Sequence, residues 1–314
     1  MTPASSTIIQ VACVVLLAPF ATGMVRWAKA RLQGRRGASP LLPYVTIATL
    51  LRKEMVVSPV TSWVFHLTPF VVLGTALALA ALLPLMSAFG AFAGHDDFIF
   101  VSALLALGAV FLVLGGLDPG SAFGGMGASR EMTIAALIEP AMITTFAAFA
   151  VASGTGSVSG MLAVGGAGIV AQPALIASIA ALVLVMLAEN ARYPVDNPAT
   201  HLELTMVHEA MVLEYSGPYL AMLELASSVK LAVFALLLGN MIVPNFLLVS
   251  GIGAVGVLLA IAVAIAKVSV AMVLLALLES SIPKMRFYRM QEYCAVAFLL
   301  AFAGLVLTVT QVLV

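Results

Sequence analysis

Eight stretches of mostly apolar residues divide this chain, and each is long enough to cross a lipid bilayer. A helix needs roughly 20 such residues, at a rise of 1.5 Å each, to span a hydrocarbon core about 30 Å thick. The sequence therefore predicts an all-α integral membrane protein with eight transmembrane helices, forming a single polytopic domain over residues 1–314. The stretches lie near residues 5–26, 61–88, 97–117, 129–153, 171–190, 217–241, 246–279 and 291–313.

The composition agrees with a location in a lipid bilayer. Hydrophobic residues make up 63% of the chain and charged residues 9%, whereas soluble domains are about 45–50% apolar. The 14 basic and 14 acidic residues balance, so net charge gives no indication of a nucleic-acid partner, and we expect none. No Lys or Arg precedes Arg26, so we expect residues 1–25 to be a retained first span rather than a cleaved signal.

The basic residues predict the orientation of the chain, because Lys and Arg in short loops are retained on the cytoplasmic side. They gather in or beside four segments, at about 27–60, 118–129, 190–216 and 280–290, while the loops after the second, fourth and sixth stretches carry none. We therefore expect both termini to face outward from the inner (cytoplasmic) membrane. Within the first segment, residues 40–58 are predicted to form an amphipathic helix along the inner interface.

The polar cytoplasmic loop between the fifth and sixth spans is unusual. Residues 194–215 have the sequence PVDNPATHLELTMVHEAMVLEY. Pro194 and Pro198 exclude a continuous helix from the fifth span, whereas residues 201–215 lack Pro and Gly and are predicted to be helical. On such a helix the two histidines share one face, and two of the carboxylates share another. The titratable residues of the segment are Asp196, His201, Glu203, His208, Glu209 and Glu214.

This polar segment admits two interpretations. Carboxylates in a partly buried row repel one another, which raises some of their pKa values toward neutrality and makes them suitable proton carriers. The alternative is a solvated loop whose charges meet only water, and we expect this for Glu209. The two histidines are seven residues apart without a nearby third ligand, so we expect no metal site there.

Several charged residues are predicted to lie at bilayer depth. Glu139 follows Arg130 by nine residues, about 13.5 Å of helix, which places it near the bilayer centre. Glu224 and Lys230 lie inside the sixth span, and Lys267, with Glu279, is expected in the inner half of the seventh. An ionised group facing lipid costs at least about 2.5–3.5 kcal/mol, so such residues line a proton path or form static ion pairs between helices.

Other sequence features argue against cofactors within this chain. Cys13 and Cys294 lie in apolar surroundings, so we expect no disulfide scaffold, zinc site or cysteine-ligated cluster. Two Gly-rich runs, at residues 115–127 and 154–168, have the composition of linkers and lack a phosphate-binding pattern.

Four segments resemble the membrane subunit of group 4 nickel–iron hydrogenases, a family similar to subunit 1 (the H subunit in bacteria) of respiratory complex I. They are RLQGRRGASPLLPY, GGMGASREMTIAALIEP, the run from Ala188 to Phe234, and PKMRFYRMQEY. The resemblance covers essentially the whole chain. It implies eight spans with outward termini, an interfacial first helix, and a long cytoplasmic loop that touches the soluble electron-transfer arm.

The resemblance also implies a function and its residues. The subunit would lie under the hydrogenase large and small subunits and an iron–sulfur electron-transfer subunit, and begin a polar path toward antiporter-like membrane subunits. Together with the buried charges, it predicts a proton (or sodium) path of Glu139, Glu203, Glu214, Glu224, Lys230 and Lys267. The loop-docking residues are Arg192, Asp196, His201, His208 and Glu209, and the supporting residues are Arg130, Lys53, Glu54 and Glu189.

On this interpretation the chain is a non-catalytic subunit without a redox centre, and the nickel–iron centre and iron–sulfur clusters belong to partner subunits. Three alternatives stay open. One is subunit 1 of a quinone-reducing dehydrogenase, although two glutamates of that branch would fall at Ala199 and His201 here. The others are a passive membrane anchor for the hydrogenase arm and a stand-alone transporter.

Overall fold

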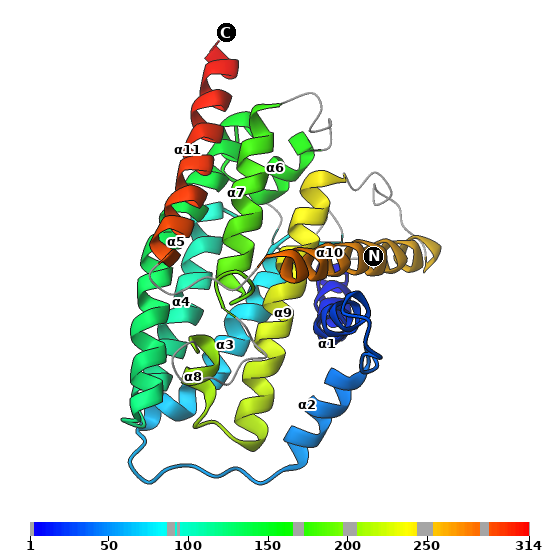
Figure 1. Ribbon diagram of the computed structural model, residues 1–314. Coiled ribbons are helices and arrows are strands. Elements are labelled where there is room, and N and C mark those ends of the chain that lie inside the picture. Colours follow the sequence, from blue (N-terminus) through cyan, green and yellow to red (C-terminus); the bar gives the residue numbers. More distant parts are fainter. Residues whose placement is uncertain are drawn as a thin grey trace.

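The computed structural model describes residues 3–86, 92, 95–165, 173–196, 206–243, 254–282 and 289–313. Within these ranges every regular element is a helix, as predicted (Figure 1). The helices are α1 (Pro3–Leu32), α2 (Leu42–Arg52), α3 (Trp63–Leu82), α4 (Phe98–Leu117), α5 (Ala122–Ser153), α6 (Val158–Gly165), α7 (Ala174–Glu189), α8 (His208–Val212), α9 (Gly217–Ile242), α10 (Ala254–Ser281) and α11 (Met290–Leu313).

Seven of the helices in the described ranges, α1, α3, α4, α5, α9, α10 and α11, are long and apolar enough to cross a membrane. The protein is therefore a multi-pass membrane protein. Each of the eight predicted spans has a helix, but α7, at the predicted fifth span, has 16 residues. At 1.5 Å per residue it is about 24 Å long, short of a bilayer core of about 30 Å.

The last residue of α7, Glu189, ends the helix one residue before the predicted end of the fifth span. Its carboxylate lies 2.6 Å from the ammonium of Lys230, and Lys230 is halfway along α9. Beyond Glu189 the chain turns, and backbone hydrogen bonds from Arg192 to Leu187 (2.8 Å) and from Asp196 to Arg192 (3.1 Å) hold the turn. Non-helical backbone at this depth is tolerated only where protein or a water-filled cavity surrounds it. The polar segment therefore enters the bundle.

The helix predicted at residues 201–215 is much shorter in the structure. Helix α8 covers five residues, His208–Val212, and Met206 and Val207 before it are not helical. Residues 201–205 lie outside the described residues. Its side chains Ala210, Met211 and Val212 are buried, so packing against α4 and α5 holds this single turn in place.

The Gly-rich run at residues 115–127 is packed rather than a linker. The Ser121 hydroxyl accepts from the Gly124 N–H and caps α5, which therefore begins seven residues before the predicted start. A Cβ atom at Gly127 would lie 2.8 Å from the Val207 carbonyl oxygen, and one at Gly116 would lie 2.9 Å from the Met211 Cβ. The absence of side chains lets α8 approach α4 and α5 closely.

Within the segment predicted to form an interfacial helix, residues 40–58, the structure has a helix over Leu42–Arg52, α2, which packs against α1 and α9 (Figure 1). Beyond it, the Ser216 hydroxyl exchanges hydrogen bonds with the backbone of Val56, each 2.8 Å. Asp118 accepts from the Ser62 N–H at 2.6 Å. Parts of three predicted cytoplasmic segments thus meet at one end of the bundle. Helix α10 runs across the direction of α9 and α11, and α1 is seen almost end-on (Figure 1).

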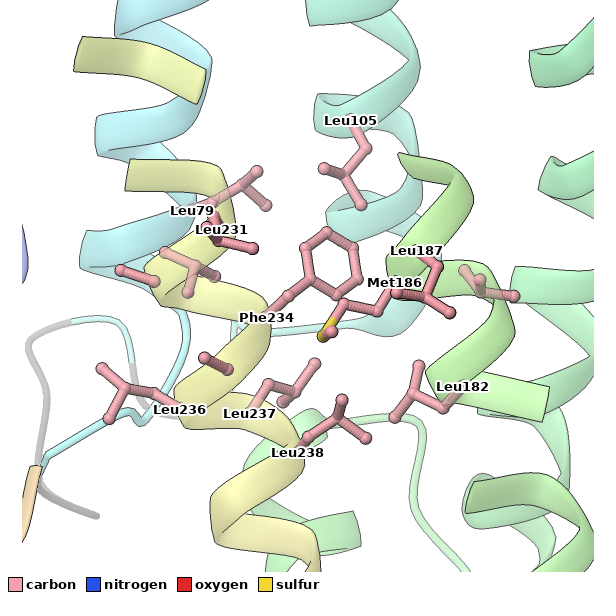
Figure 2. Close-up of a cluster of buried hydrophobic side chains, with 14 of the residues drawn as sticks. Leu79, Leu105, Leu182, Met186, Leu187, Leu231, Phe234, Leu236, Leu237 and Leu238 are labelled. Atoms are coloured by element: carbon pink, nitrogen blue, oxygen red, sulfur yellow. The ribbon is translucent and has the colours of Figure 1, made fainter. Parts of the chain in front are cut away.

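Helix α9 lies at the centre of the hydrophobic core. All of its residues from Leu231 to Leu238 are buried, and they pack against leucines of α3, α4 and α7 (Figure 2). The Phe234 ring, one helical turn beyond Lys230, lies among Leu79, Leu105 and Met186 in Figure 2. The apolar core therefore begins directly beyond the ammonium of Lys230.

A Gly127→Val substitution tests the close contact between α5 and α8. The added side chain meets Val207 and Ala210, and overpacking of this kind costs about 1–3 kcal/mol. We expect a lower melting temperature for the purified protein in detergent. Gly125→Val is the matched control, because a Cβ at Gly125 meets nothing within 4 Å. Equal melting temperatures for the two variants would contradict the close contact.

Candidate functional site

A polar cavity of about 380 Å³ opens between α1, α8, α9, α10 and the turn after α7. We call it the main chamber. Its volume has room for on the order of ten water molecules, since each occupies about 30 Å³. Positive and negative side chains share its wall. The charged or titratable residues that line it are Arg26, Lys29, Arg192, Asp196, His208, Glu209, Glu224 and Glu279.

One wall of the main chamber is held by ion pairs around Glu279. Its side chain is fully buried, and its carboxylate lies 3.0 Å from the Lys29 ammonium and 4.0 Å from the Arg192 guanidinium. These residues come from α10, α1 and the turn after α7. Because removing one partner leaves a buried charge uncompensated, the cluster ties the three elements together.

The segment that leads into α8 is held by two side chains predicted to be functional. Asp196 is buried, and its carboxylate accepts from the backbone N–H groups of Val207 (3.3 Å) and His208 (3.2 Å). The Arg130 guanidinium donates to the Met206 carbonyl oxygen at 2.7 Å. Both contacts stabilise non-helical backbone, so Asp196 and Arg130 position α8 against the main chamber.

Burial shifts the protonation of the residues on α8. Desolvation, followed by the nearby charges of Glu224 and Asp196, raises the pKa of Glu209 from 4.5 to about 7. Desolvation, followed by the charge of Lys230, lowers the pKa of His208 to about 4. Burial also lowers the pKa of Arg192, an effect that Glu279 opposes. His208 is therefore neutral at pH 7, and Glu209 exchanges protons near that pH.

A smaller cavity of about 60 Å³ lies beside the main chamber, between α3, α4, α5, α7 and α9. We call it the inner chamber. Its lining residues include Glu131, His208, and the ion-paired Glu189 and Lys230. Among the described residues, neither a hydrogen bond nor an ion pair is found for Glu131. The inner chamber thus holds two carboxyl groups and one ammonium group.

Four residues line both chambers: Asn190, His208, Leu223 and Ser227. They form the wall between the two chambers. The Asn190 amide donates to the Met186 carbonyl oxygen at 2.9 Å, but its own oxygen is buried and has no hydrogen-bond partner among the described residues. A buried acceptor of this kind costs free energy unless water reaches it. The wall is therefore polar and suited to hydration.

The structure separates three of the predicted path residues from both chambers. Glu139 is half-buried on α5, and Glu214 is exposed beyond α8. Lys267 donates to the Asn240 side chain (2.8 Å) and the Val243 carbonyl oxygen (3.0 Å). Those two residues lie at the end of α9 farthest from Glu224, so the placement of Lys267 in the inner half of its span was wrong. The reason is that α10 crosses the bundle.

Of the other predicted site residues, some line a chamber and others do not. Glu224, Lys230 and Glu189 line the chambers. The expectation that Glu209 is a solvated loop residue was wrong, because α8 packs inside the bundle and Glu209 lines the main chamber. The remaining residues line neither chamber or cannot be placed: Lys53 and Glu54 are exposed, and Glu203 and His201 lie outside the described residues.

Sequence reasoning missed two central carboxyl groups. Glu131 was overlooked because its neighbour Arg130 was singled out instead, although an acidic residue early in an apolar span is itself a signal. Glu279 was noticed in the seventh span but not assigned to the site. Its partner Lys29 belongs to a basic run near the first span, and nothing in the sequence indicates which of those cations turns inward.

Comparisons with known proteins agree with this architecture. A family model described as NADH dehydrogenase matches residues 5–309. Formate hydrogenlyase subunit 4 of Escherichia coli (strain K12) is 30% identical over 280 residues, covering 89% of this chain and 90% of that protein. Hydrogenase-4 component C of the same organism is 30% identical over 295 residues, covering 93% and 91%.

Among solved structures, the fold is similar to a chain of the membrane-bound sulfane sulfur reductase, an archaeal respiratory membrane complex. The TM-score is 0.81 at 16% sequence identity, and the match covers 96% of this chain and 98% of that chain. At this identity the similarity concerns the fold alone.

A Glu209→Gln substitution tests the burial of Glu209. The folded-state pKa of about 7 is above the unfolded value of 4.5, so the stability that Glu209 contributes is complete below pH 4.5 and is lost as pH rises through 7. The variant does not titrate there. Its melting temperature relative to the natural protein should therefore increase from pH 4.5 to 7. A difference that stays constant with pH would contradict the burial.

Proposed function

This chain belongs to the NADH dehydrogenase family, and we propose that it is the membrane-embedded coupling subunit of an energy-converting nickel–iron hydrogenase complex. In this role it docks the soluble hydrogenase arm and links electron transfer to the movement of protons, or of sodium ions, across the cytoplasmic membrane. The observation that carries the proposal is the main chamber, with titratable side chains deep inside the bundle of a chain similar to two hydrogenase-complex subunits.

The arrangement of charges favours coupling over a passive anchor. An anchor requires polar contacts on the surface of the loop, but has no use for titratable groups inside the bundle. Here His208 and Glu209 face the main chamber, and Glu224 lies in the same wall. Burying these groups is costly, and a Glu209 carboxyl group with a pKa of about 7 can gain and lose protons under physiological conditions.

Among the described residues, the lining of both chambers on α9 reaches no further than Lys230. Lys230 also lines a void of about 10 Å³ together with Phe146, Phe234 and Leu237. This void is apolar and too small to favour water, so the helix packing beyond Lys230 is dry. A proton that reaches Lys230 and does not return to the chambers would leave sideways, toward another subunit. This favours a coupling component over a stand-alone transporter.

The position of Glu139 is an argument for a membrane partner subunit that covers the outer side of α5. Glu139 is half-buried in the middle of a spanning helix, and an ionised side chain facing lipid costs at least about 2.5–3.5 kcal/mol. Covering by an antiporter-like membrane subunit removes that cost and extends the polar path from this chain. In this arrangement Glu139 is the contact point of the two subunits.

The soluble arm is proposed to dock at the end where the Ser62–Asp118 and Val56–Ser216 contacts lie. That end is the cytoplasmic one, and both chain termini face outward. The nickel–iron centre and the iron–sulfur clusters belong to the large, small and electron-transfer subunits. This chain contributes residues that carry ions and none that carry electrons.

Purification of the tagged chain from its native membranes in mild detergent tests the assembly. Nickel-containing large and small hydrogenase subunits should copurify, as identified by mass spectrometry and metal analysis. Copurification of a complete quinone-reducing dehydrogenase without nickel would overturn the hydrogenase assignment.

A Glu224→Gln substitution tests ion coupling. Glutamine cannot carry a proton, so proton uptake by inverted membrane vesicles should fall by about tenfold or more. Hydrogen turnover with a viologen dye should persist, because the redox centres lie in other subunits. The same change at Glu214, which is exposed beyond α8, should leave proton uptake near that of the natural complex. Unchanged uptake in the Glu224 variant would argue against a transport role for the main chamber.

A further inference from the structure

We propose that His208 passes protons from the main chamber to Glu131, and that Glu131, Glu189 and Lys230 together hold one exchangeable proton. This inference rests on the proposed function and specifies its route. The route runs through the wall between the two chambers, where His208 is the one ionisable side chain among the four shared lining residues.

The backbone of His208 is held in place by a hydrogen bond, whereas its imidazole ring can take part in proton transfer. Its backbone N–H donates to the buried Asp196 carboxylate at 3.2 Å, which holds the start of α8 against the wall. Among the described residues, no hydrogen bond of the imidazole ring is found. His208 lines both chambers, so this one residue borders the space on either side of the wall.

A neutral imidazole can pass a proton without holding a charge. Its unprotonated nitrogen accepts a proton from the main chamber while its other nitrogen releases one to the inner chamber, and a ring flip restores the first tautomer. One proton enters and one leaves, so charge balances. Lys230 and Arg192 oppose a charge on this ring, and Asp196 favours it. The neutral resting state suits transfer rather than storage.

We assign storage of the proton to the side chains of Glu131, Glu189 and Lys230 in the inner chamber. Two carboxylates and one ammonium carry a net charge of −1, and binding one proton makes the group neutral. Lys230 now pairs with Glu189 at 2.6 Å, which leaves Glu131 to take the proton. When Glu131 releases that proton, it becomes a second anionic partner for the Lys230 ammonium. Either carboxyl group can then pair with Lys230 while the other takes up the next proton.

The wall supplies the remaining polar contacts for transfer. The Asn190 amide oxygen is a buried acceptor for which the described part of the chain offers no partner, and Ser227 lines both chambers. Water held by these groups can reach the His208 ring from either chamber. On the main-chamber side, Glu209 and Glu224 are the nearby acids from which protons arrive.

The experiment uses the intact complex in inverted membrane vesicles, with proton uptake measured by a pH-sensitive dye and hydrogen turnover by a viologen assay. His208→Phe and Glu131→Gln should each lower proton uptake by about tenfold or more, with the soluble subunits retained. Glu131→Asp keeps a carboxyl group and should restore uptake, which a purely structural role for Glu131 does not predict. His66→Phe is the matched control, because His66 is exposed on α3 and lines neither chamber.

The double variant His208→Phe/Glu131→Gln decides whether the residues share one route. Its uptake should equal that of the stronger single variant, because a blocked route cannot be blocked twice. Natural uptake in either single variant, alongside loss in Glu224→Gln, would overturn this inference and leave the proposed function intact. Natural uptake in Glu224→Gln as well would instead mean that the proposed function fails.

Discussion

The ion pair between Glu189 and Lys230 holds the polar turn after α7 against the middle of the bundle. It joins the last residue of α7 to the midpoint of α9 at 2.6 Å. After Glu189 the chain turns, and the next described helix, α8, has five residues. Because that backbone lies at bilayer depth, it must be enclosed by protein or water, and both chambers surround it.

Enclosure of a polar segment explains the other unusual features. Glycines of α4 and α5 let α8 approach their backbones, Arg130 and Asp196 satisfy the backbone around it, and Glu279 joins α10 to α1. The chambers then end at the apolar core around Phe234 (Figure 2). Among the described residues, the packing beside Lys230 and Phe234 leaves a void of about 10 Å³.

Much of this could be predicted from the sequence. Apolar length gave the helices and their order, and the charge pattern singled out Glu224, Lys230 and the polar segment. Helical geometry explains one limit. Nine residues separate Arg130 and Glu139, which at 100° per residue places them on opposite sides of α5. The spacing therefore gave the depth of Glu139 but not its direction, and the inner chamber is lined by Glu131 instead.

The sequence by itself determined the membrane-spanning, helical character of the chain, because apolar runs of sufficient length have few stable alternatives in lipid. It also determined the presence of charges at depth. Only the tertiary structure decided which of those charges share a chamber. Lys29, Arg192 and Glu279 are distant in the chain, and their meeting depends on how α1 and α10 cross the bundle. Such crossings arise from packing between helices, which no single segment encodes.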